Sequence, residues 1–498
     1  MPISPSLARR LADPSLIPEA GLVGGTWCGE AQSGKRFEVT NPANGDVLAS
    51  LPDFSRAEAA DAIKAAQTAQ RAWAAQSGKE RSAVLRKWHD LAIANADDLA
   101  AILTAEMGKP LAEAKGEILY GASYIEWFAE EAKRIYGDVI PGHQRDKRIV
   151  IIKQPVGVVA AITPWNFPNA MVSRKVAPAL AAGCAIVLKP AAQTPLSSIA
   201  LAVLAERAGL PAGLFSVITT TGSRDFGAEI TENPVVRKLT FTGSTEVGRT
   251  LMAQAAPKIM KLSLELGGNA PFIVFDDADI DAAVEGAIVS KFRNAGQTCV
   301  CANRLYVQDG VYDEFAEKLS RRVAAFKVDD GFAEDVAIGP LVDGKALEKV
   351  NEHVADALQK GAKLVVGGGA HERGGNFFQP TVLTGVDASM LVAREETFGP
   401  LAPLFRFKDV GDVIAQANDT EFGLAAYFYA TSLKRIWQVA EALECGMVGV
   451  NTGLISTEVA PFGGIKQSGF GREGSKYGLE DYLDIKYICL GGIDGEAE

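Results

Sequence analysis

Cys299 is the residue of this sequence best suited to act as a nucleophile. It follows Asn294–Gly296, where a helical pattern ends at a glycine that suits a C-terminal cap. We therefore expect the thiol on a loop beyond the end of an element, where reactive groups are often presented. Taken alone, a cysteine is more often a small buried apolar residue than a nucleophile, by roughly four to one. Attack on substrate by this thiol is therefore a hypothesis that needs an activating partner.

Glu265 is the candidate base for that thiol. The four histidines lie in polar, helical or turn-like surroundings without a link to Cys299, so no Cys–His pair is indicated. Glu265 instead ends an apolar strand-like run and precedes two glycines, which allow close backbone approach. A carboxylate partly removed from water has a raised pKa and suits proton abstraction. A strand-end glutamate paired with a surface cation is an equal alternative in isolation.

A third polar group, Asn166, lies in Ile162–Pro168, between a buried strand and a helical segment. Ligands of open α/β sheets collect at the carboxyl ends of strands. The amide of Asn166 could hold a developing oxyanion together with the backbone N–H of Cys299. A turn built by Pro164 and Pro168 is the alternative, and the segment alone slightly favours it.

Two further segments suit a nucleotide. The strand Ala185–Leu188 leads into Lys189, which places a cation at a strand end. In Phe241–Gly248 a strand, a glycine turn and a helix follow one another, so N–H groups at Ser244 and Thr245 favour a phosphate. The glycine spacing differs from G-x-G-x-x-G, and the segment by itself is a weak dinucleotide signal.

Composition narrows the possible functions. The chain has 498 residues, too many for one core, and 48% hydrophobic with 22% charged residues is ordinary globular composition. A net charge of −11 disfavours nucleic acid as a partner. The N-terminal residues Met1–Pro5 lack the apolar core expected of a signal peptide, and no uninterrupted apolar run is long enough to predict a bilayer span. Six scattered cysteines, of which only Cys299 and Cys301 are close, predict no metal site and a reduced, cytoplasmic enzyme.

The elements that must position these residues fall into two α/β units. A helical region from about Ala57 to Ile135, interrupted at Gly108–Pro110, precedes alternating strands and helices typical of a parallel sheet. The expected strands of the first unit are Val156–Ile162, Ala185–Leu188, Leu214–Ile218 and Lys238–Phe241. A second unit begins with the strand Pro271–Phe275 and has helices at Ile280–Arg293, Val311–Phe326 and Leu347–Lys360. Arg148–Lys153 and Asp484–Leu490 read as edge strands or as strands added across subunits.

Taken together, the motifs resemble the aldehyde dehydrogenase superfamily over nearly the whole chain. They occur in the order Pro164–Pro168, Phe241–Ser244, Leu264–Gly268, Gly296–Cys299 and Glu395–Pro400. The resemblance implies that the Cys299 thiolate attacks an aldehyde, that Asn166 and the Cys299 N–H hold the oxyanion, and that hydride passes to a nicotinamide. Glu265 would then activate the water that hydrolyses the thioester.

The resemblance also implies the cofactor contacts and the architecture. The matching cofactor positions are Trp165, Lys189, Pro190, Ala191, Ala192, Gly243, Ser244, Thr245, Leu266, Glu396 and Phe398. The implied fold is α/β: a Rossmann-type cofactor domain, an α/β catalytic domain and a small β oligomerisation arm. The expected ranges are 1–138 and 154–268 for the cofactor domain, 269–466 for the catalytic domain, and 139–153 with 467–498 for the arm. A homodimer or homotetramer follows from the resemblance.

Within the superfamily the chain is most similar to the succinate-semialdehyde dehydrogenases and to the glutarate-semialdehyde enzymes. The matching segments are Ser173–Lys175, Lys291–Asn294, Cys299–Cys301 and Gly453–Ser456. A substrate with a distal carboxylate needs a fixed cation, and arginine offers a bidentate fork. Arg174 and Arg293 match the carboxylate clamp of that subgroup, with Ser456 as an added donor. The sequence does not separate succinate from glutarate semialdehyde.

Two positions bear on cofactor choice and regulation. NAD-preferring relatives commonly carry an acidic residue three positions after the matching lysine; here Ala192 stands there, which favours NADP by about two to one and leaves NAD possible. The C-x-C of the subgroup can oxidise, and a Cys299–Cys301 disulfide across one residue would be strained and reducible. A packing role for Cys301 is an equal alternative.

Three other functions stay open at this point. A betaine-type or general aldehyde dehydrogenase would take a neutral or cationic substrate, which Arg174 and Arg293 disfavour. A binding protein that kept the fold without turnover would not need Cys299, Glu265 and Asn166 together. A cysteine acyl-hydrolase without nicotinamide would leave Lys189 and Glu396 unexplained.

Overall fold

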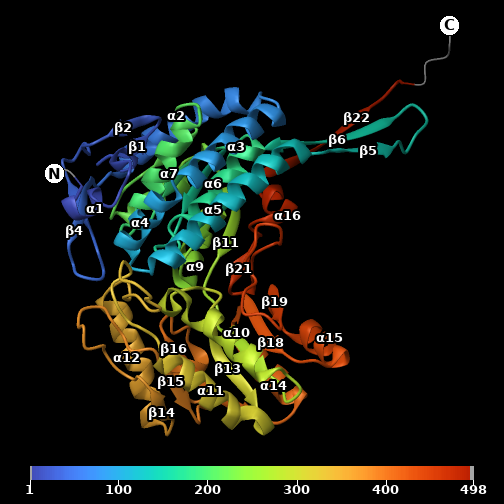
Figure 1. Cartoon of the computed structure of the whole chain (residues 1–498). Coiled ribbons are helices and arrows are strands. Elements are labelled where there is room, and N and C mark those ends of the chain that lie inside the picture. The colour runs from blue at the N-terminus through green and yellow to red at the C-terminus, as the bar shows by residue number, and fades with distance from the viewer. Residues whose placement is uncertain (1–2, 494–498) are drawn as a thin grey trace.

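The computed structural model describes residues 3–493 and contains two large sheets, each with its own apolar core, and an arm that projects from the body (Figure 1). The N-terminal part of the chain packs in the first core, and the next segment forms two strands of the arm. The chain then forms most of the first sheet and after it the second sheet. Near its C-terminus it adds one more strand to the first sheet and one to the arm. An α/β fold with two units is confirmed.

The first sheet has eight strands, and its centre is parallel, as predicted. In spatial order the strands are β2 (Thr26–Cys28), β1 (Gly21–Val23), β9 (Phe215–Val217), β8 (Ala185–Lys189), β7 (Val158–Ile162), β10 (Val236–Thr242), β11 (Lys261–Glu265) and β21 (Gly469–Phe470). The helices that follow its strands are α6 (Ala170–Ala182), α7 (Leu196–Arg207), α8 (Ser223–Glu232) and α9 (Thr245–Ala255). The four strands expected for this unit are confirmed, with ends that differ by up to two residues.

The helical region expected at Ala57–Ile135 is four helices that pack beside this sheet (Figure 1). They are α2 (Arg56–Ala74), α3 (Gly78–Ala94), α4 (Ala96–Met107) and α5 (Leu111–Glu131). The interruption at Gly108–Pro110 is confirmed: Gly108 ends α4 with a φ of 92°. A Cβ on Gly108 would lie 2.6 Å from Cγ of Pro340, so glycine is required there by both conformation and space.

The second sheet has seven strands with a parallel centre. They are β14 (Lys363–Val366), β15 (Thr381–Thr384), β16 (Leu401–Phe407), β13 (Ala302–Gln308), β12 (Ala270–Val274), β18 (Ala425–Tyr429) and β19 (Met447–Val450). The helices around it are α10 (Ile280–Phe292), α11 (Tyr312–Ala324), α12 (Gly344–Gln359), α14 (Val410–Asn418) and α15 (Leu433–Ala442). The predicted second α/β unit is confirmed.

The arm is a three-stranded antiparallel sheet of β5 (Asp138–Pro141), β6 (Arg148–Pro155) and β22 (Leu483–Leu490). The two edge strands expected from the sequence therefore pair with each other. The predicted range 467–498 assigns residues 467–482 to the arm, but β21 in this range pairs with β11 of the first sheet, and α16 (Ser475–Glu480) packs against α5 and α6. The domain boundaries otherwise stay a prediction.

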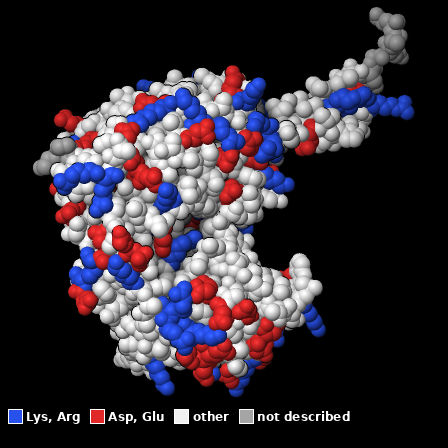
Figure 2. All heavy atoms as spheres, in the orientation of Figure 1, with Lys and Arg blue, Asp and Glu red and all other residues white. Residues whose placement is uncertain are grey.

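The remaining elements are short. They are α1 (Pro5–Ala8), β3 (Arg36–Thr40), β4 (Val47–Pro52), β17 (Phe422–Gly423), β20 (Ile465–Lys466) and α13 (Leu391–Arg394). Over residues 3–493, no helix combines the length and the apolar character needed to cross a membrane. In the space-filling view the surface is hollowed between the two large units, and the predicted site residues come from elements on both sides (Figure 2).

Candidate active site

A tight turn presents Cys299. Helix α10 ends at Phe292, earlier than expected, and Gly296 is not its cap: Asn294 and Ala295 both adopt left-handed φ values, of 53° and 52°, before Gly296 at 77°. The backbone N–H of Asn294 donates to Oε2 of Glu113 at 2.8 Å, which holds this costly turn in place. A Cβ on Gly296 would lie 2.1 Å from the carbonyl oxygen of Gly399, so only glycine fits.

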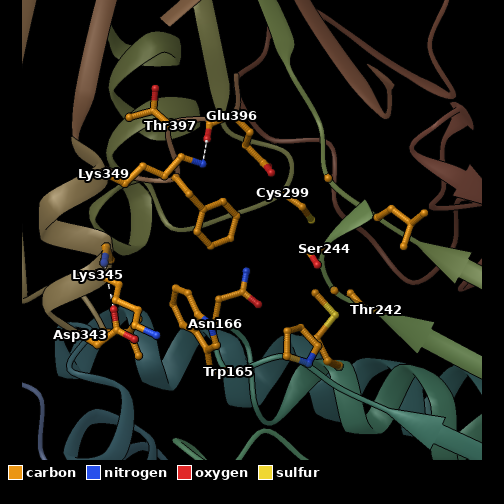
Figure 3. Close-up of a pocket in the computed structure, with 18 residues that line it drawn as sticks. Trp165, Asn166, Thr242, Ser244, Cys299, Asp343, Lys345, Lys349, Glu396 and Thr397 are labelled. Atoms are coloured by element: carbon orange, nitrogen blue, oxygen red, sulfur yellow. Dashed lines mark hydrogen bonds between the residues drawn. The ribbon is translucent and has the colours of Figure 1, made fainter. Parts of the chain in front are cut away.

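Cys299 lies between two cavities. The first has a volume of about 400 Å³ and the second about 310 Å³, and Cys299 and Met171 line both. Figure 3 shows the first cavity, with Cys299 on one side and Asn166 and Trp165 on another. One thiol is therefore accessible from two separate binding spaces. This is the arrangement that a reaction between two bound molecules requires.

The thiol is half-buried, and burial raises its pKa to about 12. Arg174 opposes that shift, while Glu396 and Glu265 add to it. A neutral thiol is therefore the resting form of the free enzyme at pH 7. Formation of the thiolate needs a proton acceptor or a change in the local charge.

Asn166 follows β7 and is buried next to the Cys299 loop. Its Nδ2 donates to the carbonyl oxygen of Gln297 at 3.1 Å, and its backbone oxygen accepts from Nζ of Lys109 at 2.8 Å. An amide nitrogen carries two protons, so one remains for another acceptor. The predicted oxyanion donor thus lines the same cavity as the nucleophile.

Glu265 ends β11 and is buried, and neither carboxylate oxygen has a hydrogen-bond partner within residues 3–493. Burial holds its pKa well above the usual range, and the nearby Glu473 adds to the shift. The side chain lines neither of the two cavities. A buried carboxyl group with unused oxygens suits a base that accepts a proton from water.

Sequence reasoning missed the charged cluster behind Glu265. Glu473 is buried, pairs with Arg174 at 2.6 Å and accepts a short hydrogen bond from Nζ of Lys175. These two cations hold the pKa of Glu473 below its usual value. A signal was present in the sequence, because Glu473 is a charged residue directly before Gly474, much as Glu265 lies shortly before Gly267.

The predicted cofactor residues divide into two groups. Those that line the first cavity are Trp165, Gly243, Ser244, Leu266, Glu396 and Phe398. Those that do not line it are Lys189, Pro190, Ala191, Ala192 and Thr245. Lys189 ends β8, where burial lowers its pKa to about 8, and Ala192 is half-buried three residues beyond it. The structure therefore brings the first group together around one cavity and does not place the second group in it.

The first cavity fits a dinucleotide in its chemistry. Ser244 caps α9 and lines the cavity, which places the N-terminus of that helix at the cavity wall, and Oγ1 of Thr242 is buried without a partner in the described chain. Glu396 accepts from the N–H of Gly268 at 3.3 Å, and burial raises its pKa to about 7. Trp165 and Phe398 meet edge to face at 5.5 Å. Helix N–H groups suit phosphate, and an available carboxylate suits ribose hydroxyls.

The predicted substrate residues line the second cavity together. Arg174, Arg293 and Ser456 all contribute to its wall. Nε of Arg293 is buried without a hydrogen-bond partner among the described residues, and its guanidinium lies 5.4 Å from the centre of the Phe167 ring. Sequence reasoning missed the part of this wall formed by α5 and the break before it, which includes the buried pair of Lys109 and Glu117 at 2.5 Å. An anionic group would find an available cation here.

Comparison with known proteins identifies the family of this chain. The model of the aldehyde dehydrogenase family matches residues 27–488. The chain belongs to the aldehyde dehydrogenase family. It is 66% identical to the NADP(+) succinate-semialdehyde dehydrogenase GabD of Escherichia coli strain K12, over 97% of this chain and 100% of that protein. It is 64% identical to the glutarate-semialdehyde dehydrogenase of Pseudomonas aeruginosa, over 97% and 100%.

Solved structures give the same result. An NADP-dependent enzyme of E. coli superposes with a TM-score of 0.96 at 66% identity, over 97% of this chain and 100% of that one. The succinate-semialdehyde dehydrogenase of Burkholderia pseudomallei has a TM-score of 0.96 at 61% identity, over 97% and 99%. The predicted aldehyde dehydrogenase fold is confirmed.

Two further features of this aldehyde dehydrogenase concern its thiols and metals. Cys301 is buried, donates to the carbonyl oxygen of Lys291 at 3.4 Å, and has a pKa that burial raises to about 11. All six cysteines, which lie within the described residues, are free. No group of three or more histidine, cysteine or acidic side chains suited to a metal occurs in residues 3–493.

Proposed function

We propose that this aldehyde dehydrogenase oxidises a short-chain semialdehyde, in the first place succinate semialdehyde, to the dicarboxylate, with NADP as its preferred cofactor and NAD as an alternative. The observation that carries the proposal is the position of Cys299 between two cavities, one with Glu396 and the α9 N-terminus, the other with the uncompensated Arg293. The relatives named above are a succinate-semialdehyde dehydrogenase and a glutarate-semialdehyde dehydrogenase, which supports this substrate class.

The residues of the chain divide the reaction between the two cavities. Arg293 and Ser456 would bind the distal carboxylate and place the aldehyde carbon against Sγ of Cys299. The thiolate attacks that carbon to give a thiohemiacetal, whose oxyanion Nδ2 of Asn166 and the N–H of Cys299 stabilise. Removing one such donor costs roughly 3–4 kcal/mol of barrier in other oxyanion holes.

The cofactor would be held by the residues of the first cavity and the Lys189 segment. NADP, when bound, supplies the hydride acceptor for the oxidation. The thioester left on Cys299 is then hydrolysed by water, from which Glu265 accepts a proton. Since Glu265 lies outside both cavities in this structure, its side chain would turn toward Cys299 for that step.

Three parts of the proposal concern the chain beyond its reaction. The arm would join copies of this chain as a homodimer or homotetramer, because it exposes apolar side chains such as Val139 and Ile485, 81% and 71% exposed. In Figure 2 the middle of the arm is largely free of charged residues.

We further propose a cofactor domain of residues 1–138 and 154–268 and a catalytic domain of residues 269–466, as expected from the sequence. We also propose a reversible Cys299–Cys301 disulfide that blocks the nucleophile.

A substrate panel tests the proposal. Purified protein is given succinate semialdehyde, glutarate semialdehyde, betaine aldehyde and butanal, each with NADP and with NAD, and kcat/KM is measured. We expect the two acidic aldehydes to exceed the others by at least about tenfold, because a charge-assisted hydrogen bond adds about 1.5–3 kcal/mol. Equal turnover of butanal and succinate semialdehyde would overturn the acidic substrate class, and absence of turnover with all four would overturn the activity.

A further inference from the structure

His353 is a buried side chain that the reaction above does not use. It lies within α12 and is 1% exposed. Its Nδ1 lies 3.1 Å from Oγ1 of Thr397, and its Nε2 lies 3.4 Å from Oε2 of Glu395. The two ring nitrogens thus reach the residues on either side of Glu396, the acidic residue of the cofactor cavity.

The chemistry of the two neighbours fixes the roles of the ring nitrogens. Burial and the charge of Lys349 lower the pKa of His353, so the ring is neutral at pH 7 and carries one proton. A carboxylate only accepts, so the proton belongs on Nε2, facing Glu395. Nδ1 then accepts from the hydroxyl of Thr397. Nε2 has no hydrogen-bond partner within residues 3–493, so its contact with Glu395 is electrostatic, and Nδ1 with Thr397 is the hydrogen bond of this ring.

The same helix holds Glu396 from a second point. Lys349, one turn before His353, donates from Nζ to the backbone oxygen of Glu396 at 2.6 Å, a contact that Figure 3 shows at the cavity wall. On the other side, Asn303 bonds the backbone of Glu395 and Thr397, at 2.8 and 3.1 Å. The backbone around Glu396 is therefore fixed on two sides, and His353 contacts the side chains of both flanking residues.

The loop needs such support because its backbone is not in a relaxed conformation. Phe398, which packs on Trp165 in the cavity, has a φ of 56°, in the left-handed region. Bulky residues adopt that region only when their surroundings hold them there. If the side-chain contacts of His353 were lost, the buried hydroxyl of Thr397 would lose its partner, and the side chains of Glu396 and Phe398 would be held less firmly although Lys349 and Asn303 still bond the backbone.

We propose that His353 is a positioning residue for cofactor binding, which holds Glu395 and Thr397 so that Glu396 and Phe398 face the dinucleotide. The inference rests on the proposed function, since it takes the first cavity as the cofactor site. His353 touches neither substrate nor cofactor, and its contribution passes through the loop. Loss of His353 therefore weakens dinucleotide binding far more than it slows the chemical steps at Cys299.

The test measures the Kd of NADP by titration calorimetry on the full-length protein, with KM and kcat alongside. His353→Leu removes both contacts, and we expect Kd to rise about tenfold, as for one lost hydrogen bond, with kcat at saturation within about twofold. His353→Gln keeps one donor and one acceptor, and its Kd should stay within about threefold of wild type. Rescue by glutamine separates positioning from mere packing.

Val354→Ala is the matched control, because Val354 is the next buried residue of α12 and faces the apolar core. It should lower the Tm without changing the Kd. Thr397→Val removes the same hydrogen bond from the loop side, and its Kd should also rise about tenfold, which keeps the test decisive if His353→Leu does not fold.

Wild-type affinity for NADP in both His353→Leu and Thr397→Val would overturn this inference but leave the proposed function intact. An equal loss of affinity in Val354→Ala would overturn it as well, since general destabilisation would then explain the effect. Wild-type protein that binds neither NADP nor NAD would overturn the proposed function, and this inference with it.

Discussion

Arg174 and Glu473 form an ion pair at 2.6 Å, with 3% and 4% of their side chains exposed. Both residues are far apart in the sequence, on α6 and on the segment after β21. The pair distinguishes the two arginines of the second cavity, because the charge of Arg174 is already compensated by Glu473. Nε is buried without a hydrogen-bond partner in both arginines, but Arg293 forms no ion pair within the described residues, so it is the cation available to a substrate carboxylate.

We therefore predict that Arg293→Gln discriminates between substrates more sharply than Arg174→Gln. The KM for succinate semialdehyde should rise by about 10- to 100-fold in Arg293→Gln, while that for butanal changes little. Arg174→Gln leaves Glu473 with one cation fewer, so it should mainly lower the Tm, since breaking a buried pair costs about 3–5 kcal/mol. Substrate kinetics and thermal unfolding of both variants measure this. A larger acidic-substrate defect in a stable Arg174→Gln would contradict the assignment.

The reactivity of Cys299 should increase with pH. Its pKa is raised to about 12 by burial, so below that value the thiolate fraction grows about tenfold for each pH unit. The rate of alkylation of the free enzyme by iodoacetamide should follow the same slope between pH 7 and 9. Peptide mapping assigns the modified cysteine, and Cys299→Ala is the control that should lose the fast reaction. A plateau reached below pH 8 would show that the thiol is activated in the free enzyme.

The local helices and strands, and the site residues that lie in motifs, could be predicted from the sequence. Alternating apolar strands and glycine breaks predicted both sheets, because these signals act within a few residues. The pair of Arg174 and Glu473 was beyond reach, since it forms between segments that only the folded chain brings together. The same is true of Glu113, which supports the Cys299 turn from α5. Long-range contacts between charged side chains have no periodicity that a single sequence displays.

The end of α10 shows a second limit. The expected cap at Gly296 was wrong because Asn294 and Ala295 adopt left-handed conformations before it, and Gly296 lies so close to the backbone of Gly399 that a Cβ would not fit. Local propensity favours a simple glycine cap. Tertiary contacts with Glu113 and Gly399 outweighed that preference, as is usual where strain is kept at a functional site.

Ala192 should control the choice of dinucleotide. An acidic side chain at this position would hydrogen-bond a ribose but repel a 2′-phosphate, whereas alanine does neither. In Ala192→Glu we expect the Kd of NADP to rise by about tenfold or more and that of NAD to fall or stay constant. Binding titrations with both dinucleotides measure the ratio. Gln193→Glu, at the exposed neighbouring position, is the matched control for the added charge.

Equal Kd changes in Ala192→Glu and Gln193→Glu would assign the effect to net charge. An unchanged NADP:NAD ratio in Ala192→Glu would remove this position from cofactor selection.

Cys301 should protect the nucleophile from irreversible oxidation. Hydrogen peroxide converts the Cys299 thiolate to a sulfenic acid with release of hydroxide, and the Cys301 thiol then displaces water to form the disulfide. Wild-type activity lost to peroxide should return with dithiothreitol. In Cys301→Ser the loss should become largely permanent, because over-oxidation of Cys299 is no longer intercepted. Mass spectrometry of the intact protein distinguishes the disulfide, which is lighter by two hydrogens, from the oxygen adducts. Full recovery of activity in Cys301→Ser would show that the Cys299–Cys301 disulfide does not protect the nucleophile.

Glu265 should act after hydride transfer, so its loss should separate the two halves of the reaction. Glutamine keeps the size of the side chain but cannot accept a proton from water. Glu265→Gln should therefore show a rapid burst of reduced cofactor equal to the enzyme concentration, followed by a steady state slowed by about 100-fold or more, within the range of general-base contributions. Stopped-flow absorbance measures both phases, and acid-quenched protein should carry the acyl group on Cys299. Glu473→Gln is the informative comparison, since Glu473 raises the pKa of Glu265. It should lower that pKa and shift the pH profile of deacylation toward acid without a burst. A normal steady state in Glu265→Gln would assign the base to another residue.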